Sequence, residues 1–359
     1  MSLPYLHPYL GLSNGLNTLH AAGGGAGGIG GWVELGRTTL GSNGDTITVS
    51  SLADKRYYMV LGHFTDSGLA NVKYRMGNST LDTGGNYAKR QSVNGGADVT
   101  GAPQSNVEIT QDNADDDKFH ISYISNNSSN EKLMFNWAVE RGDNSGAANA
   151  PARVETVCKW ANTSNPLDII SCFNDRTGDY TSGSEVVVLG WDPADTHTNN
   201  FWEELDSVTL ESAGDTLQSN TFTAKKYLWI QYMLIGSTTD LETQITFNAD
   251  SGSNYAQRRS QNGGSDVTNI NQSKLEPITS KNNYNYFGNM FFINNASNEK
   301  LGIHHSVEQN AAGASNAPSR HEGVMKWTNT SNQITSVKIF NNGAADYSIG
   351  STIKVWGAN

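Results

Sequence analysis

Apolar and polar residues alternate in short segments along most of this chain. In the segment Asp45–Ser50, Ile47 and Val49 fall on one face, which is the period of two expected of a half-buried strand. The segment Lys55–Leu61 continues as a strand with apolar residues on both faces. Further strands are predicted at 132–139, 154–161, 185–189 and 352–356. Because no segment shows a sustained i, i+3, i+4, i+7 stripe, the pattern predicts an all-β protein.

The same pattern occurs twice. The segment 83–100, TGGNYAKRQSVNGGADVT, returns at 251–268 as SGSNYAQRRSQNGGSDVT with 12 identities in 18 positions. The segment 149–165, NAPARVETVCKWANTSN, returns at 316–332 as NAPSRHEGVMKWTNTSN with 12 identities in 17 positions. The repeating unit of about 160 residues is the size of a domain, whereas solenoid repeats are shorter and cannot bury a core alone.

Two tandem domains follow from this duplication. We expect a first β-sandwich over 32–191, a linker over 192–200 and a second β-sandwich over 201–359. About eight strands in each copy, with loops of varied length, favour a jelly-roll-like sandwich. Each copy contains Asn-Gly-Gly, at 94–96 and 262–264, which predicts a tight turn because Asn and Gly tolerate positive φ.

Residues 1–31 differ from both copies. Large apolar residues come first, and a Gly-rich stretch over 20–31 follows as a flexible linker. An apolar arm on a tether predicts a peg for a partner or a sister subunit, and folding back onto the first domain is the alternative. The apolar residues of this candidate particle-anchoring arm are Leu3, Tyr5, Leu6, Tyr9, Leu10, Leu12, Leu16 and Leu19. The opening segment lacks basic residues and a continuous apolar core, so it fits neither a signal peptide nor a membrane span.

Charge and cysteine content narrow the classes of partner. The formal net charge of −11, without a long run of Lys or Arg, argues against nucleic acid. Cys158 and Cys172 correspond to Met325 and Ile339 in the second copy, so both are expected to be small buried hydrophobic residues. The eight histidines show no helical i, i+4 pair and no Cys partner, so no metal site or other cofactor is predicted. The run Asp112–Asp117 is predicted to be an exposed acidic loop.

Several phrases of the sequence resemble a known family. GRTTLGSNGDTITV, NYAKRQSVNGGADVT, NAPARVETVCKWANTSN and GSEVVVLGWDPADTHTNNFWEEL are similar to repeated modules of virion structural proteins from tailed viruses (bacteriophages and their relatives) of environmental, largely aquatic, prokaryotes. The resemblance covers nearly the whole chain beyond residue 31, and MSLPYLHPYLGL resembles the openings of such proteins. It implies a location in a virus particle and supplies no catalytic residue. The resemblance does not distinguish a component of the head from one of the tail or of a fibre.

Carboxylates that recur in both copies are the candidates for acid–base chemistry. A glycosidase needs two of them across one cleft, about 5–9 Å apart. Arg153 and Glu155, like Arg320 and Glu322, are two residues apart on a predicted strand, so a strand-surface ion pair is the simpler interpretation. The recurring carboxylates are Asp45/Asp215, Asp98/Asp266, Glu131/Glu299, Glu155/Glu322 and Asp179/Asp346.

The densest polar motif also recurs. An aromatic ring with amide and guanidinium donors suits the hydroxyl groups of a sugar, so the motif is either a glycan-binding site or a brace for the Asn-Gly-Gly hairpin. Its residues are Asn86, Tyr87, Arg90, Asn94 and Asp98, repeated as Asn254, Tyr255, Arg258, Asn262 and Asp266.

From these features we expect a non-enzymatic virion structural protein, assembled in the host cytoplasm. We expect a capsid decoration or cement protein that its N-terminal arm holds on other virion proteins, as a homo-oligomer for which a trimer is one arrangement. One alternative is a receptor- or carbohydrate-binding tail or fibre component that recognises a host surface glycan. Another is a double jelly-roll major capsid protein. A polysaccharide hydrolase is a third.

Overall fold

A computed structural model describes residues 31–359, except residues 112, 115, 143, 196–199, 237–240 and 279–283. Throughout this described part, every regular element is a β-strand. The chain is therefore an all-β protein, as the alternating pattern predicts. The anchoring-arm residues Leu3 to Leu19 lie outside the described residues.

Residues 32–191, called copy 1 from here on, form two main antiparallel sheets. The large sheet runs, in spatial order, β1 (Val33–Thr39), β16 (Glu185–Trp191), β3 (Tyr57–Ser67), β11 (Asp117–Ser125), β12 (Lys132–Glu140), β13 (Ala152–Trp160), β7 (Tyr87–Val93) and β8 (Val99–Gln104), and β15 (Asp179–Tyr180) pairs with β3. The small sheet runs β2 (Thr46–Val49), β14 (Ile169–Phe173), β5 (Lys73–Asn78) and β6 (Thr80–Leu81), with β9 (Val107–Glu108) beside β5. The short strands β4 (Leu69–Ala70) and β10 (Asn113–Ala114) form a separate pair.

Residues 201–359, called copy 2, repeat this arrangement. The large sheet runs β17 (Glu203–Thr209), β27 (Thr352–Ala358), β19 (Tyr227–Leu234), β23 (Tyr286–Ile293), β24 (Lys300–Glu308), β25 (Ser319–Trp327), β21 (Tyr255–Gln261) and β22 (Val267–Gln272). The small sheet runs β18 (Thr216–Gln218), β26 (Val337–Asn341) and β20 (Thr243–Phe247). In both copies the first strand lies beside the last, so each large sheet joins strands that are far apart in sequence. This order confirms the expected jelly-roll-like β-sandwich.

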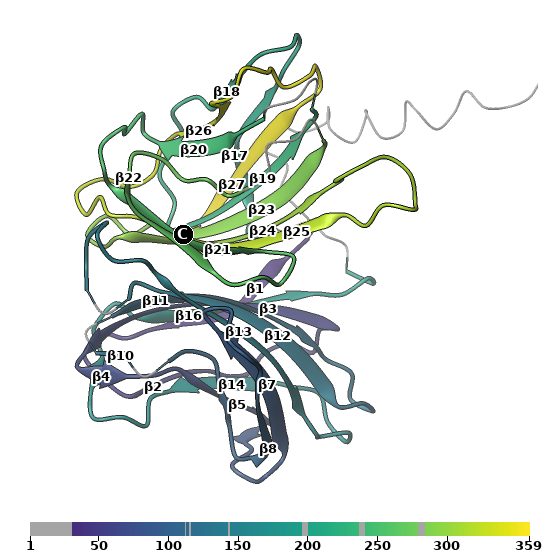
Figure 1. The fold of residues 1–359 in the computed structure, drawn as a ribbon. Helices are drawn as coiled ribbons and strands as arrows, with labels where there is room; N and C mark the ends of the chain where they lie inside the picture. Colours follow the sequence, from purple (N-terminus) through teal and green to yellow (C-terminus); the bar gives the residue numbers. More distant parts are fainter. Residues whose placement is uncertain are drawn as a thin grey trace, which may run out of the picture.

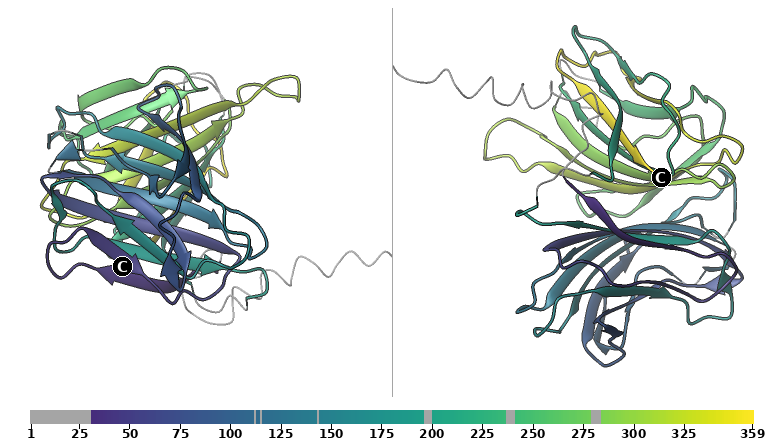
Figure 2. Two further views of the ribbon diagram at one scale, coloured as in Figure 1. Left: turned by 90° about the horizontal axis from the view of Figure 1, so that it is seen from below. Right: turned by 180° about the vertical axis from the view of Figure 1, so that it is seen from behind.

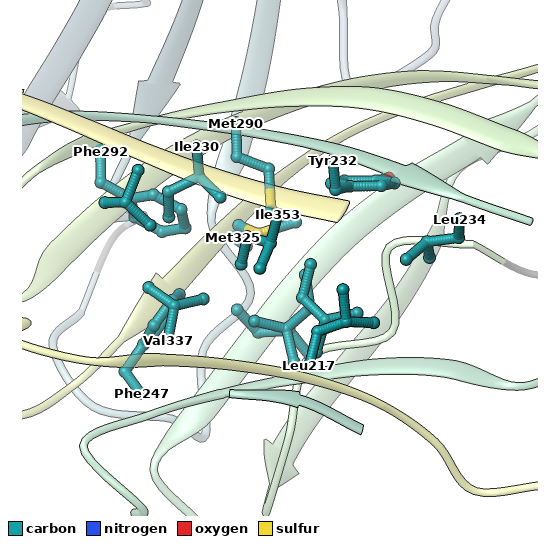
Figure 3. Close-up of a cluster of buried hydrophobic side chains, with 14 of the residues drawn as sticks. Leu217, Ile230, Tyr232, Leu234, Phe247, Met290, Phe292, Met325, Val337 and Ile353 are labelled. Carbon is teal, nitrogen blue, oxygen red and sulfur yellow. The ribbon is translucent and has the colours of Figure 1, made fainter. Parts of the chain in front are cut away.

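Each copy buries a core between its large and small sheets. In β2 the side chains of Ile47 and Val49 are buried, as the period of two predicts. The cysteines Cys158 and Cys172 are free thiols that belong to the core of copy 1. Figure 3 shows the equivalent core of copy 2, where Met325 lies close to Met290 and Ile353. Each copy is thus a complete sandwich.

A third core joins the two copies. The large sheets face each other, so that the molecule is a stack of small, large, large and small sheets (Figure 1). The same stacking is seen from behind in Figure 2. Buried apolar side chains from both copies, among them Phe119 and Val139 of copy 1 and Leu301 and Ile303 of copy 2, form one continuous cluster. This cluster covers only part of each large sheet, and the part of copy 1 that is left open forms the candidate site.

Candidate functional site

Large apolar side chains are exposed at one end of the large sheet of copy 1, on the face turned toward copy 2. Leu133 and Val157 are 57% and 52% exposed, and Phe135 is 43% exposed. Tyr123 pairs with Phe135, and Phe135 pairs with Val157, so these three side chains form a row across β11, β12 and β13. Exposed apolar rows of this kind are typical of interaction surfaces.

Aromatic rings make up much of the surface. Tyr57 stacks on Trp191 with ring centroids 5.4 Å apart, and Tyr123 stacks on Phe135 at 5.1 Å. Trp32, at the start of the described chain, meets Tyr123 edge to face at 6.2 Å. These residues enclose a hollow of 840 Å³, called the groove from here on. The apolar side chains that define it are Trp32, Tyr57, Tyr123, Leu133, Phe135, Val157 and Trp191.

The rim of the groove carries cations that already have partners. Lys89 lies 2.9 Å from Glu108, and Lys159 lies 2.8 Å from Glu131. Arg90 forms a 3.2 Å ion pair with Asp98, in which both side chains are about half exposed. The groove therefore has an apolar floor and a neutralised rim, which suits an apolar ligand better than an anion.

A second hollow of 380 Å³ continues from the groove into the interface between the copies. One wall contains Phe135 and Glu155 of copy 1, and the other contains Arg320 and Glu322 of copy 2. At its inner end, the rings of Trp137 and His305 are 4.3 Å apart. The two large sheets thus touch at this point and leave space on the side of the groove.

On the opposite side the two copies are bonded together. Arg153 of copy 1 donates to Asp266 of copy 2 at 2.6 Å, and both side chains are buried. Glu185 accepts from Lys226 at 2.9 Å and from Tyr227 at 2.8 Å. Burial opposes the charge of Glu185, but hydrogen bonds from Thr39, Lys226 and Tyr227 hold its pKa below its usual value. This closed side fixes the orientation of the copies.

Both tyrosines of the recurring polar motif are buried. Tyr87 is 2% exposed, and its hydroxyl donates to the carbonyl oxygen of Met76 at 2.8 Å and accepts from the Met76 amide at 2.9 Å. Tyr255 is fully buried and its hydroxyl accepts from the Phe247 amide at 3.0 Å. Burial raises the pKa of both phenols well above the usual range. Neither ring is available to stack on a sugar.

The amides of the motif hold turns in place. Asn86 donates to Asp82, which also accepts from the indole of Trp160 at 2.8 Å, and Asn254 and Asp250 repeat this arrangement. Asn94 accepts from the Arg153 amide at 2.8 Å, and Asn262 accepts from the Arg320 amide at the same distance. Of the charged members, Arg90 and Asp98 reach the rim of the groove, whereas Arg258 and Asp266 lie at the closed side.

Three of the recurring carboxylates, Asp98, Glu155 and Glu322, line the second hollow, and each of them pairs with an arginine. Asp45 and Asp179 are neighbours near a solvent-exposed edge, and a hydrogen bond that protonated Asp45 donates to Asp179 is the main cause that raises the pKa of Asp45. Glu131 pairs with Lys159 at the rim, and Glu299 pairs with Lys326 at 3.3 Å on the closed side. Arg153 pairs with Glu155 at 3.0 Å and with Glu322 at 3.4 Å, so these two carboxylates share a cation.

Two predictions about charged residues need correction. Arg153 pairs with Glu155 at 3.0 Å as expected, but Arg153 is 5% exposed in the interface, so this is no strand-surface pair. The run at 112–117 was expected to be an exposed acidic loop, yet Asp116 and Asp117 are buried. Copy 2 contacts both sites, because Asp266 bonds to Arg153 and Asn298 bonds to Asp117, and the pattern of a single strand does not predict such contacts.

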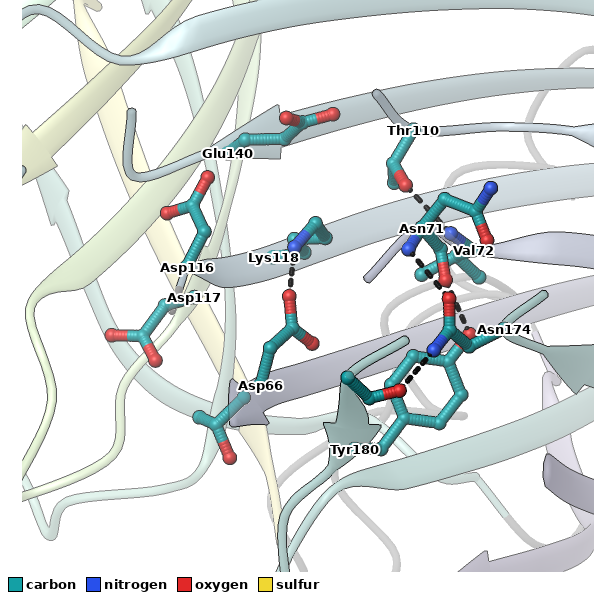
Figure 4. A network of polar contacts seen from close by, with 12 residues as sticks. Asp66, Asn71, Val72, Thr110, Asp116, Asp117, Lys118, Glu140, Asn174 and Tyr180 are labelled. Atoms are coloured by element: carbon teal, nitrogen blue, oxygen red, sulfur yellow. Dashed lines mark hydrogen bonds and ion pairs between the residues drawn. The ribbon is translucent and has the colours of Figure 1, made fainter. Parts of the chain in front are cut away.

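Buried charges surround Asp116. Figure 4 shows Asp116 near Lys118 and Glu140, with Lys118 bonded to Asp66. Burial is the main cause that raises the pKa of Asp116 to about 7. Within the residues that the structure describes, no group of three or more His, Cys, Asp or Glu side chains is arranged to hold a metal ion. The same residues contain no helix long and apolar enough to cross a membrane.

The groove residues were not predicted from the sequence as a site. The signal was present in Lys55–Leu61 and 132–139, where apolar residues occupy both faces of a strand. Such a strand is either buried on both faces or exposes one apolar face as an interaction surface. Only the way copy 2 packs on the sheet distinguishes these two possibilities.

No protein-family model matches this sequence, and no curated protein shows significant similarity to it. Among solved structures, domains LG4-5 of the mouse laminin α1 chain align with 93% of this chain and 90% of that chain, at 9% identity and a TM-score of 0.21. The LG1-3 region of the laminin α2 chain aligns with 87% of this chain and 64% of that chain, at 8% identity and a TM-score of 0.20. TM-scores this low carry no argument about fold or function.

Proposed function

We propose that this protein is a non-enzymatic structural component of a virus particle, that it decorates the head, and that its apolar N-terminal arm attaches it there. The observation that supports this best is the position of the groove, because Trp32, at the start of the described chain, lines it. The described chain thus begins beside an apolar surface, and the sequence that precedes it is apolar. Burial contributes about 25 cal/mol per Å² of apolar surface before the cost of association, so several arms acting together can hold an oligomer on a particle.

The joined copies suit this role. The shared core and the ion pair between Arg153 and Asp266 make the two sandwiches one body. In a trimer this body presents six similar sandwiches, which matches sites of local threefold or sixfold symmetry on a shell.

The test is association with purified particles. The full chain with Leu3, Leu6 and Leu10 changed to Ser should no longer sediment with particles, while its unfolding transition stays unchanged. Ile349→Ser is the matched control, because Ile349 is 61% exposed in copy 2, outside the groove, and should leave association intact. Undiminished association of the arm variant would reject the proposal, and a copy number equal to that of the shell subunit would favour a major capsid protein instead.

A carbohydrate-binding tail or fibre component is the second candidate. The stacked and partly exposed rings of Tyr57 and Trp191 favour it, because aromatic faces are used to bind sugars. Host polysaccharide binding that is lost in Tyr57→Ala, with unchanged stability, would support this candidate. Release of sugar from that polysaccharide would point instead to a hydrolase.

A further inference from the structure

We propose that in the free protein the groove is filled by the apolar arm of the same chain, residues 3–12. This inference does not depend on the assignment to a virus particle, because it concerns the purified chain alone. It names the ligand of the groove, which is a segment without a single charged side chain between Met1 and Leu19.

The duplication shows what kind of surface the groove is. Strand register makes the two copies directly comparable, since Phe135 faces Val157 in copy 1 and Ile303 faces Val324 in copy 2. Six groove residues therefore have counterparts in copy 2, namely Trp32, Tyr57, Tyr123, Leu133, Phe135 and Val157. In the same order, the counterparts are Trp202, Tyr227, Phe291, Leu301, Ile303 and Val324.

All six counterparts are buried in the core between the copies. The contrast within pairs is large, because Leu133 is 57% exposed and its counterpart Leu301 is fully buried. In copy 2 this surface is covered by apolar side chains of copy 1, among them Phe119 and Val139. The same surface in copy 1 is thus of a type that apolar protein side chains cover.

The arm is the apolar segment that is nearest along the chain. Trp32 lines the groove and meets Tyr123, so the chain leaves the described part beside the site. A Gly-rich coil as long as the stretch 20–31 spans about 20 Å root-mean-square, which is long enough for residues 3–12 to reach the groove. Because a short flexible tether gives an effective concentration in the millimolar range, binding within one chain is favoured over binding from another molecule.

Storage of the arm has a consequence for assembly. Each of the two apolar surfaces covers the other in the free protein, which protects the chain from aggregation. When the chain attaches to a particle, the arm leaves the groove and binds a site on the particle. The groove and the particle site therefore compete for the same arm.

Disulfide cross-linking in the full chain tests the proposal. Leu6→Cys is combined with Leu133→Cys in the groove, and in the control it is combined with Ile349→Cys, which is equally exposed but in copy 2. The native Cys158 and Cys172 are buried, and burial raises the pKa of both thiols, so both react more slowly than an exposed cysteine. Under mild oxidation at low protein concentration, we expect the groove pair to link within one chain at least tenfold faster than the control. Equal rates would overturn the proposal, and so would linked dimers, which would show that a neighbour's arm fills the groove.

A second measurement does not depend on introduced cysteines. Binding of an apolar fluorescent dye such as anilinonaphthalene sulfonate should increase several-fold when Leu3, Leu6 and Leu10 are changed to Ser. Adding Phe135→Asp to this variant should remove the increase. Unchanged dye binding in the arm variant would show that the groove is open in the wild-type chain and would overturn the proposal.

Discussion

Single residues show how the two copies solve the same packing problem differently. In copy 1, Gly62 lies opposite His120, and a Cβ atom on Gly62 would come within 2.0 Å of the imidazole. In copy 2 the corresponding pair is reversed, because Tyr232 lies opposite Gly288. In each copy a large ring lies over a glycine, so the pairing of one large with one small residue is kept while the two positions are exchanged. The sequence does not reveal this exchange, since it depends on which residues face each other across the sheet.

The buried imidazole of His120 predicts an acid-sensitive stability. Burial lowers the pKa of His120 to about 3, whereas an unfolded histidine titrates near about 6.5. Between these values only the unfolded chain binds the proton, so the free energy of unfolding decreases as the pH falls from about 6.5 toward 3, by up to about 1.4 kcal/mol per pH unit. In His120→Gln this contribution is absent. Urea unfolding between pH 7.5 and 4 should show a smaller loss for the variant, and parallel curves for the two proteins would contradict the assignment.

At the scale of elements, strand positions and tight turns could be predicted from sequence. The alternation of apolar and polar residues over 45–50 predicted β2. The apolar residues on both faces of 55–61 predicted β3. Both Asn-Gly-Gly turns form, with φ values of 50° and 69° at Asn94 and Gly95, and 53° and 71° at Asn262 and Gly263. The order of strands in the sheets could not be predicted, because pairing such as that of β1 with β16 joins residues about 150 positions apart and leaves no local signal.

The two turns provide a matched pair of substitutions. Alanine at a left-handed position costs about 1–2 kcal/mol, and Gly263→Ala should destabilise the chain by this amount, because its Cβ would meet only the flexible end of Arg320 at 3.2 Å. In Gly95→Ala the Cβ would lie 2.5 Å from the buried carboxylate of Asp266. Denaturant titration should therefore show a larger loss for Gly95→Ala. An equal loss would mean that the turn does not press against copy 2.

At the scale of the whole molecule, the duplicated sheets face each other but make contact mainly on one side. Equivalent residues therefore have different surroundings, and Arg153 is 5% exposed whereas Arg320 is 62% exposed. The sequence predicted two domains and the pairing of Arg153 with Glu155. It could not predict the groove, because the groove exists only where one copy fails to cover the other.

This asymmetry predicts unequal effects of one substitution. Arg153→Met leaves the buried Asp266 without its main partner, which should lower the free energy of unfolding by about 3–5 kcal/mol. Arg320→Met removes an exposed side chain and should change it by less than about 0.5 kcal/mol. Equilibrium unfolding in urea measures both, and similar losses would show that the closed side is not what joins the copies.

An electron cryomicroscopy map of intact particles tests most directly the central proposal of adhesion to a virus head through the N-terminal arm. We expect density for the two stacked sandwiches on the outer surface of the head, with the chain before Trp32 entering a contact with the shell. Density for the body only at a tail or fibre tip, or as the shell itself, would contradict it.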